Sequence, residues 1–253
     1  MLKERTKKLH KGRVAKIERV SCSSHFIEFE AESGIISSPG QFVSILCNNL
    51  TLRRPFSIAS QSENRIGVLF KERGEGTEYI KSLKKGDLID FVGPLGNGFN
   101  ISNKKSLLVG AGIGIAPIFY LQNTLTSLHI ESLLIGGFFS NDEIPSNIKC
   151  DITCTNDGSL GEKGSVIDYL EDVIDEYSPE IIYSCGPKIV LENVAKIAQK
   201  HSIESQVAIE KVMACGIGVC KGCAIKVIKN GEVQNATVCK DGPVFNGGEV
   251  VWQ

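Results

Sequence analysis

The sequence predicts a multi-domain β and α/β protein: an antiparallel β-barrel, then a parallel α/β domain, then a small cysteine-rich domain. Short strands separated by glycine and proline fill the first part, and strands alternate with amphipathic helices in the second. The third part gathers four of the nine cysteines. A length of 253 residues suits two compact domains and a small third one. We place these domains at residues 1–103, 104–204 and 205–253.

The composition excludes several classes of protein. Lys and Arg number 28 against 29 Asp and Glu, so the net charge of −1 does not favour nucleic acid or an anionic membrane as a partner. No run approaches the roughly 18 apolar residues of a membrane span. The first twenty residues are charged and lack the apolar region of a signal peptide. We therefore expect a cytoplasmic protein that binds neither nucleic acid nor a membrane.

The barrel is predicted from strands that follow one another at short intervals up to about residue 100. Partial alternation of apolar and polar side chains marks residues 25–30 and 41–46, and residues 65–70 and 87–92 have the composition of further strands. Many short strands at this spacing indicate an antiparallel barrel. The turns between them contain Pro39-Gly40, Lys85-Gly86 and Gly93-Pro94.

The parallel sheet is predicted from the pattern after residue 104. An apolar strand at 106–109 enters a glycine-rich turn, and we expect the next helix to begin at Pro117, because a proline at the first helical position loses no hydrogen bond. Strands and helical stripes then alternate, which favours a parallel sheet covered by helices. The further strands are expected at 133–139 and 181–183, and the further helices at 166–174 and 189–198.

The cysteines of the third segment have the spacing of an iron-sulfur site. Cys215, Cys220 and Cys223 follow the pattern C-x4-C-x2-C, and Cys239 comes after 15 intervening residues. This spacing is typical of a plant-type [2Fe-2S] cluster, and glycines between the ligands leave room for the inorganic core. Structural zinc or unligated buried thiols are the alternatives, although zinc sites usually combine two short cysteine hooks. Visible absorption of the purified protein distinguishes these possibilities.

The glycine-rich turn of the second segment predicts a nucleotide site. Gly110, Gly112 and Gly114 lie between an apolar strand and a helix whose N-terminus can face a phosphate. Mere tight packing is the alternative for such a turn. The pattern Gly112-x-Gly114-x-x-Pro117 resembles the G-x-G-x-x-P turn of the ferredoxin-NADP reductase superfamily. That superfamily also carries a Cys-Gly pair at the nicotinamide end of its pocket, so the resemblance implies that Cys185 lines this site; a packed strand-end cysteine is the other interpretation.

The charge at the adenosine end favours NAD⁺/NADH as the substrate over NADPH. A 2′-phosphate requires arginine or lysine, whereas a free ribose hydroxyl accepts a carboxylate. Residues 140–143, after the second strand of this segment, are Ser-Asn-Asp-Glu and include no base.

A flavin is predicted from the electron count of the other two cofactors. A nicotinamide transfers two electrons as a hydride, but a [2Fe-2S] cluster accepts one. A flavin can exchange electrons with both, so the barrel is expected to bind FAD.

The flavin site is assigned to three short stretches of the barrel segment. Residues 54–57 resemble the R-x-Y/F-S flavin motif of the same superfamily, which implies a phosphate contact for the arginine and ring contacts for the next residues. Residues 69–71 would flank the ring, and residues 74–77 resemble the superfamily's second flavin contact, at the pyrophosphate. A solvated arginine pair and an ordinary capped turn are the alternatives. The expected FAD residues are Arg54, Pro55, Phe56, Ser57, Leu69, Phe70, Lys71, Gly76 and Thr77.

The whole chain resembles one family, the electron-transfer subunits of NAD-dependent class 1B dihydroorotate dehydrogenase. The resemblance covers all three segments in order and rests on residues 54–57, 155–159, 215–223 and 238–245. It implies that Asp157, within Thr-Asn-Asp-Gly-Ser, is a cofactor-binding residue. Phe56 departs from the aliphatic residue that is common in this family, which leaves its stacking role open.

The resemblance implies an electron relay with a partner. A catalytic subunit that holds FMN would oxidise dihydroorotate, in pyrimidine biosynthesis, and electrons would pass through the cluster and FAD to NAD⁺. Two catalytic and two electron-transfer subunits would form a heterotetramer. The apolar loop around Ile217 and Val219 would be a docking surface, or else part of the core. This chain shows no orotate site of its own.

Two other functions fit the same layout. The chain could be the flavin and iron-sulfur subunit of another complex, of the NAD(P)H-ferredoxin or sulfhydrogenase type. It could also be a redox-responsive binding module, which predicts no reduction of dyes by NADH. Bleaching of the bound flavin by NADH would contradict the sensor hypothesis.

Overall fold

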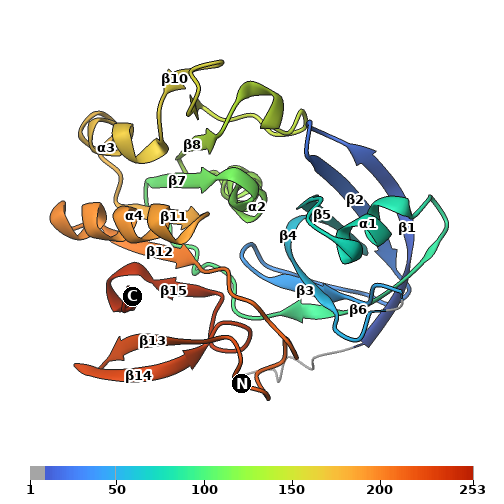
Figure 1. The fold of residues 1–253 in the computed structure, drawn as a ribbon. Helices are drawn as coiled ribbons and strands as arrows, with labels where there is room; N and C mark the ends of the chain where they lie inside the picture. The colour runs from blue at the N-terminus through green and yellow to red at the C-terminus, as the bar shows by residue number, and fades with distance from the viewer. Residues whose placement is uncertain (1–8, 49, 253) are drawn as a thin grey trace.

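The structure is a computed structural model that describes residues 9–48 and 50–252. Figure 1 shows a β-barrel beside a helix-covered sheet, with a red two-stranded hairpin below the sheet. The first eight residues of the charged N-terminal stretch lie outside the described residues. Within the described residues, none of the helices has the length and apolarity needed to cross a membrane.

The first segment forms a closed antiparallel barrel with strand order β1-β2-β5-β4-β3-β6. Alternate side chains of β1 are buried, as expected for strands with one face on a core and the other in water. The interior is filled by residues such as Ile27, Phe29 and Phe91. The strands are β1 (Leu9–Arg19), β2 (Ser24–Ala31), β3 (Phe42–Ile45), β4 (Arg54–Ser62), β5 (Arg65–Lys71) and β6 (Leu88–Leu95), and helix α1 spans Glu75–Ser82.

The second segment forms most of a sheet of order β10-β9-β8-β7-β11-β12-β15, to which the third segment adds β15. All neighbours in it are parallel except β12 and β15. Successive residues of β7 point to opposite faces: Leu108 packs with α2, and Leu107 and Val109 pack with α3 and α4. The strands are β7 (Ser106–Ala111), β8 (Ser132–Phe138), β9 (Ile152–Thr155), β10 (Glu162–Lys163), β11 (Ile181–Cys185), β12 (Glu204–Ala208) and β15 (Val244–Asn246).

The helices of this domain are α2 (Ile115–Ser127), α3 (Leu170–Tyr177) and α4 (Lys188–Lys200), and short 3₁₀ turns occupy Gly112–Gly114, Asn141–Glu143, Val166–Tyr169 and Gly247–Glu249. The prediction that the helix after the glycine turn begins at Pro117 is wrong. The 3₁₀ turn at Gly112–Gly114 continues directly into α2, so the helix starts at Ile115 and Pro117 is its third residue. Proline is tolerated there because first-turn amides have no partner within the helix.

The third segment packs against both of the others. Its hairpin, β13 (Ala224–Lys229) and β14 (Glu232–Thr237), leads to β15, which pairs with β12 of the sheet. One buried cluster contains Phe42 and Leu95 of the barrel, Val207 of the sheet, and the sulfur-bearing Cys223 and Cys239. The predicted combination of barrel, parallel α/β sheet and cysteine-rich segment is confirmed, while the exact boundaries at 103 and 204 stay a prediction.

Candidate functional site

A cavity of about 480 Å³ lies where the barrel meets the other two segments. Seven of the nine predicted flavin residues line it: Pro55, Phe56, Ser57, Leu69, Phe70, Lys71 and Thr77. They come from β4, β5 and α1, which the barrel brings together although β4 and α1 are separated in the sequence. The other walls of this cavity, which we name the flavin cavity, are formed by Phe42 and by residues of later segments, including Ile113, Glu210, Met213 and Pro243.

Arg54 and Gly76, the other two predicted flavin residues, lie against each other at the start of α1. A Cβ atom added to Gly76 would lie 2.9 Å from Cγ and 3.1 Å from Nε of Arg54. The Arg54 guanidinium donates a 2.6 Å hydrogen bond to the carbonyl of Leu52. A guanidinium beside the free first-turn amides of a helix forms a donor set that suits a diphosphate. These residues therefore fit the phosphates of FAD.

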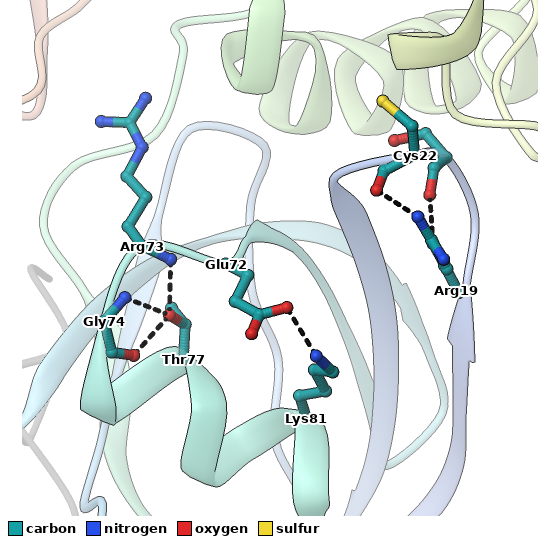
Figure 2. Close-up of polar contacts among 8 residues, drawn as sticks. Arg19, Cys22, Glu72, Arg73, Gly74, Thr77 and Lys81 are labelled. Atoms are coloured by element: carbon teal, nitrogen blue, oxygen red, sulfur yellow. Dashed lines mark hydrogen bonds and ion pairs between the residues drawn. The ribbon is translucent and has the colours of Figure 1, made fainter.

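The hydroxyl of Thr77 stabilises the turn that precedes α1 (Figure 2). The amides of Arg73 and Gly74 donate to it over 2.8 and 3.1 Å, and it donates to the Gly74 carbonyl over 2.8 Å. A nearby ion pair joins Lys81 and Glu72 over 2.7 Å. Because the hydroxyl is already bonded to the turn, it holds the helix N-terminus in place, and a direct contact with a phosphate stays a prediction.

Aromatic rings form one wall of the flavin cavity. Phe56 and Phe70 meet edge to face, with centroids 6.0 Å apart and an interplanar angle of 64°. Phe70 also stacks on the buried His25, with centroids 5.6 Å apart. Burial lowers the pKa of His25, and the positive charge of Lys81 lowers it further. The rings give a rigid apolar surface of the kind that an isoalloxazine requires.

A second cavity of about 550 Å³, which we name the nucleotide cavity, opens at the carboxyl ends of the parallel strands. It lies where the strand order changes direction, between β7 and its neighbours β8 and β11, and this switch point is the usual place for a nucleotide. Gly112 and Gly114 line it, as predicted, whereas Gly110 and Pro117 are not among the lining residues. They support the turn instead: Gly110 lies against Ile115, and Pro117 is buried within α2.

The glycine turn contacts the end of β11 at very short range. A Cβ atom on Gly114 would lie 2.5 Å from the carbonyl carbon and oxygen of Cys185 and 2.6 Å from the amide of Gly186. Gly186 lines the cavity, but Cys185 is only 2% exposed and is not part of the lining. Burial raises the pKa of the Cys185 thiol well above its usual value, so this thiol stays protonated. Its role at a nicotinamide stays a prediction.

The two cavities share a wall made of Lys71, Arg73, Ile113 and Glu210. A hydride donor in one cavity would therefore lie next to an acceptor in the other. The wall is charged, and Lys71 pairs with Glu143 over 2.8 Å. Burial raises the pKa of the Glu210 carboxyl, and the positive charge of Arg73 lowers it by a smaller amount.

Sequence reasoning missed Glu210, Arg73 and Phe42. The signal for Glu210 was available, because it is a lone acid directly after the apolar residues 207–209 and shortly before the cysteine motif. Its position between the cavities follows from the pairing of β12 with β11, which no local pattern contains.

The residues expected at the adenosine end lie on adjacent strand ends. Glu143 lines the nucleotide cavity, and so does Asn156, the neighbour of Asp157. Asp157 itself accepts hydrogen bonds from the amide and hydroxyl of Ser159, over 2.9 and 2.6 Å, and these bonds lower its pKa. The exposed ring of Phe139 also lines this cavity. A direct contact of Asp157 with a nucleotide stays a prediction.

The four predicted cluster cysteines form two pairs. Sγ of Cys223 lies 3.2 Å from Sγ of Cys239, and the amide of Cys220 donates to Sγ of Cys215 over 3.4 Å. Among the described residues, no three side chains of His, Cys, Asp or Glu converge on one metal ion. Two pairs of sulfurs suit a two-iron cluster, in which each iron takes two thiolates, better than a single zinc ion.

Backbone amides of the cysteine loop point at the sulfurs. The amides of Cys220, Ile217 and Val219 lower the pKa of the Cys215 thiol to about 6. Burial, together with the neighbouring Cys223 thiol, raises the pKa of Cys239 to about 12, although the Gly218 amide lowers it. Gly216 and Gly218 have φ of 66° and 84°, which turn the loop around the sulfurs. Amides directed at sulfur are the contacts that an anionic iron-sulfur cluster requires, so the loop fits this group.

Comparisons with known proteins agree with these sites. A family model described as the oxidoreductase FAD-binding domain matches residues 11–99, and one described as the iron-sulfur cluster binding domain of dihydroorotate dehydrogenase B matches residues 210–251. A protein of Caldanaerobacter subterraneus subsp. tengcongensis, named dihydroorotate dehydrogenase B (NAD(+)), electron transfer subunit, is 38% identical, over 96% of this chain and 98% of that protein. The chain belongs to this family of electron transfer subunits. A Desulforamulus reducens member is 31% identical, over 97% of this chain and 99% of that protein.

Solved structures share the architecture of this family member. An NADH-dependent reduced ferredoxin-NADP oxidoreductase, described in connection with flavin-based electron bifurcation, superimposes with a TM-score of 0.83 and 28% identity, over 95% of this chain and 90% of that one. The flavohem-like FAD/NAD binding domain of a nitric oxide dioxygenase from Vibrio cholerae gives 0.68 at 16% identity, over 78% and 98%. The second likeness shows the fold alone.

Proposed function

We propose that this chain carries electrons between the FMN-containing catalytic subunit of dihydroorotate dehydrogenase and NAD⁺, in pyrimidine biosynthesis. The observation that carries the proposal is the arrangement of three sites in one row. The nucleotide cavity shares a wall with the flavin cavity. The flavin cavity shares Phe42 with the group of buried apolar residues that contains Cys223 and Cys239. When bound, FAD exchanges a hydride with the nicotinamide and single electrons with the [2Fe-2S] cluster.

The protein's own contribution is binding and alignment. Arg54 and the N-terminus of α1 hold the diphosphate of the flavin, and the aromatic wall around Phe56 and Phe70 orients the ring. Gly112 and Gly114 let the dinucleotide approach the start of α2 closely. Correct placement of the two reacting rings supplies much of the rate in a hydride transfer, because the orientational entropy is lost on binding and not in the reaction.

Glu210 is a proton-bearing group in the shared wall, and Cys185 lies buried next to Gly186, which lines the nucleotide cavity. Burial raises the pKa of Glu210, and in its protonated form this carboxyl can donate a hydrogen bond to the carboxamide of the nicotinamide. Arg73 and Lys71 are the only cations among the described residues that line the nucleotide cavity, so they would face the diphosphate of NAD⁺.

The catalytic partner would dock over the cysteine loop. Val219 and Val212 are 74% and 88% exposed, on either side of Cys215 in the sequence. Exposed apolar side chains beside a redox centre suit a protein contact that brings a second cofactor close. We propose a heterotetramer of two catalytic and two electron-transfer subunits for this assembly.

Co-purification tests the proposal. The tagged chain is isolated from its native cell, the proteins that accompany it are identified, and the preparation is assayed for NADH formation that depends on dihydroorotate. We expect an FMN-containing partner, a mass that corresponds to two copies of each subunit, and activity that requires both chains. A preparation with FAD and cluster that forms no NADH from dihydroorotate would contradict the proposal.

A second function is favoured by the likeness to the NADH-dependent reduced ferredoxin-NADP oxidoreductase. The chain would then exchange electrons with a ferredoxin-type partner, in a complex of the NAD(P)H-ferredoxin or sulfhydrogenase type. The same preparation separates the two functions, because this alternative predicts NADH or NADPH formation from reduced ferredoxin and none from dihydroorotate.

A further inference from the structure

Asn97, which follows β6 of the barrel by two residues, hydrogen-bonds to the loop of the fourth cluster cysteine. Its amide donates to the carbonyl of Gly242 over 2.6 Å. Its side-chain Nδ2 donates to the carbonyls of Lys240 and Asp241, over 3.3 and 3.0 Å. The three acceptors directly follow Cys239, so Asn97 anchors the backbone that carries this sulfur.

Neighbouring backbone packs at the same place without room for side chains. A Cβ atom on Gly96, which has φ of 73°, would lie 2.5 Å from Cδ of Pro243 and 2.7 Å from the carbonyl oxygen of Gly242. On the other cysteine loop, a Cβ atom on Gly216 would lie 3.6 Å from Oγ of Ser44. Both cysteine loops therefore contact the barrel directly, one at β3 and the other at the residues that follow β6.

Phe42, on β3, connects this part of the barrel to the flavin cavity. It is 3% exposed, and it lies opposite Ser57 on β4 and opposite Leu95 on β6. It lines the flavin cavity and belongs to the same group of buried apolar residues as Cys223 and Cys239. Pro243, which ends the anchored loop, lines the flavin cavity as well. Closely packed atoms thus extend from the flavin cavity to the cluster ligands.

We propose that Asn97 is a positioning residue that holds the Cys239 loop against the barrel and thereby sets the electron-transfer distance between flavin and cluster. The inference rests on the proposed function. In each transfer the reduced flavin loses one electron and the oxidised cluster gains one, and no bond forms or breaks. The rate of such a step falls steeply as the gap widens, so a loosened loop slows it without affecting the hydride step at the nucleotide side.

The test uses the full chain loaded with FAD and cluster, as Asn97→Ala, Asn97→Asp and the control Asn64→Ala. Asn97→Asp keeps the size of the side chain but removes its two donors. Asn64 is an exposed asparagine in the β4–β5 turn, on another part of the barrel. Stopped-flow absorption after mixing with NADH follows flavin reduction, and freeze-quench electron paramagnetic resonance follows cluster reduction. Hydrogen exchange measures the opening of residues 240–242, because Pro243 has no amide hydrogen.

We expect both Asn97 variants to reduce their flavin at the wild-type rate but their cluster more slowly. Loss of these hydrogen bonds should speed amide exchange at residues 240–242 by about tenfold. Asn64→Ala should match the wild type in all three measurements. Because Asn97 is exposed, the variants should keep the core intact, which thermal unfolding verifies.

Wild-type cluster reduction in both Asn97 variants would overturn the inference, and so would slowing in Asn97→Ala with none in Asn97→Asp, because the donors would then be irrelevant. Equal slowing in Asn64→Ala would also overturn it. Failure of NADH to reduce the flavin of the wild-type chain would instead overturn the proposed function.

Discussion

Gly114→Ala tests the contact between the glycine turn and the end of β11. The added Cβ atom would lie 2.5 to 2.6 Å from three backbone atoms of Cys185 and Gly186, whereas ordinary contacts begin at about 3.4 Å. Backbone atoms cannot rotate away as a side chain can, so the turn and the strand end must separate. The backbone of Gly114 itself, with φ of −63°, accepts alanine without strain, which makes the effect purely steric.

The expected cost follows from overpacking of a tight interior, which is typically about 1–3 kcal/mol. The nucleotide cavity loses the same fitted surface, and each ~1.4 kcal/mol corresponds to about a tenfold change in affinity. We therefore expect a free energy of unfolding lower by about 1–3 kcal/mol and NADH bound about tenfold more weakly or worse. Retention of FAD should not change, because the flavin cavity does not include Gly114.

Urea unfolding and titration of NADH fluorescence measure the two effects. Gly112→Ala is the matched control for unfolding alone, because Gly112 lines the nucleotide cavity. An added Cβ atom on Gly112 meets nothing within 4 Å, but φ is 54°, so this variant carries only the left-handed backbone penalty of roughly 1–2 kcal/mol. Gly114→Ala that unfolds and binds NADH as the wild type does would refute the close packing of the turn on β11.

Three further changes address the flavin, the shared wall and the cluster. Arg54→Ala should weaken FAD retention by about 10- to 100-fold, because a charge-assisted hydrogen bond contributes roughly 1.5–3 kcal/mol; dialysis followed by flavin fluorescence measures this. Burial raises the pKa of Glu210, so the carboxyl holds its proton more tightly in the native state than in the unfolded chain. The stability of the wild type should therefore fall relative to Glu210→Gln as the pH rises above the ordinary carboxyl pKa of 4.5, which urea unfolding measures. Cys223→Ser should abolish the visible absorption of the cluster and lower the iron content.

Controls for these changes come from the same chain. Arg65→Ala, at an exposed arginine that pairs with Glu28, should leave FAD retention unchanged. Cys22→Ser, at an exposed free thiol, should keep the cluster. Equal loss of FAD in both arginine variants would contradict the phosphate role of Arg54. A stability difference between wild type and Glu210→Gln that does not vary with pH would contradict a raised carboxyl pKa. A colourless wild-type protein with stoichiometric zinc would contradict the cluster.

Most of the local chemistry could be read from sequence spacing. The C-x4-C-x2-C motif, the glycine turn after an apolar strand and the Arg-x-Phe-Ser stretch are short, and their meaning depends on neighbours within a few residues. Seven of the nine flavin residues that the superfamily resemblance implied line one cavity. The start of α2 was misplaced because Pro117 suits the first helical position in general, whereas the 3₁₀ turn before it depends on how Gly114 packs against β11.

The sequence by itself determined the order of barrel, nucleotide domain and cysteine segment, and the residue types that each cofactor requires, because these are encoded in composition, periodicity and short spacings. Only the tertiary structure decided which distant residues meet. Glu210 lies between the two cavities because β12 pairs with β11, and Asn97 reaches the Cys239 loop because the third segment folds back onto the barrel. Such contacts arise from the packing of surfaces far apart in the chain, and no local pattern records them.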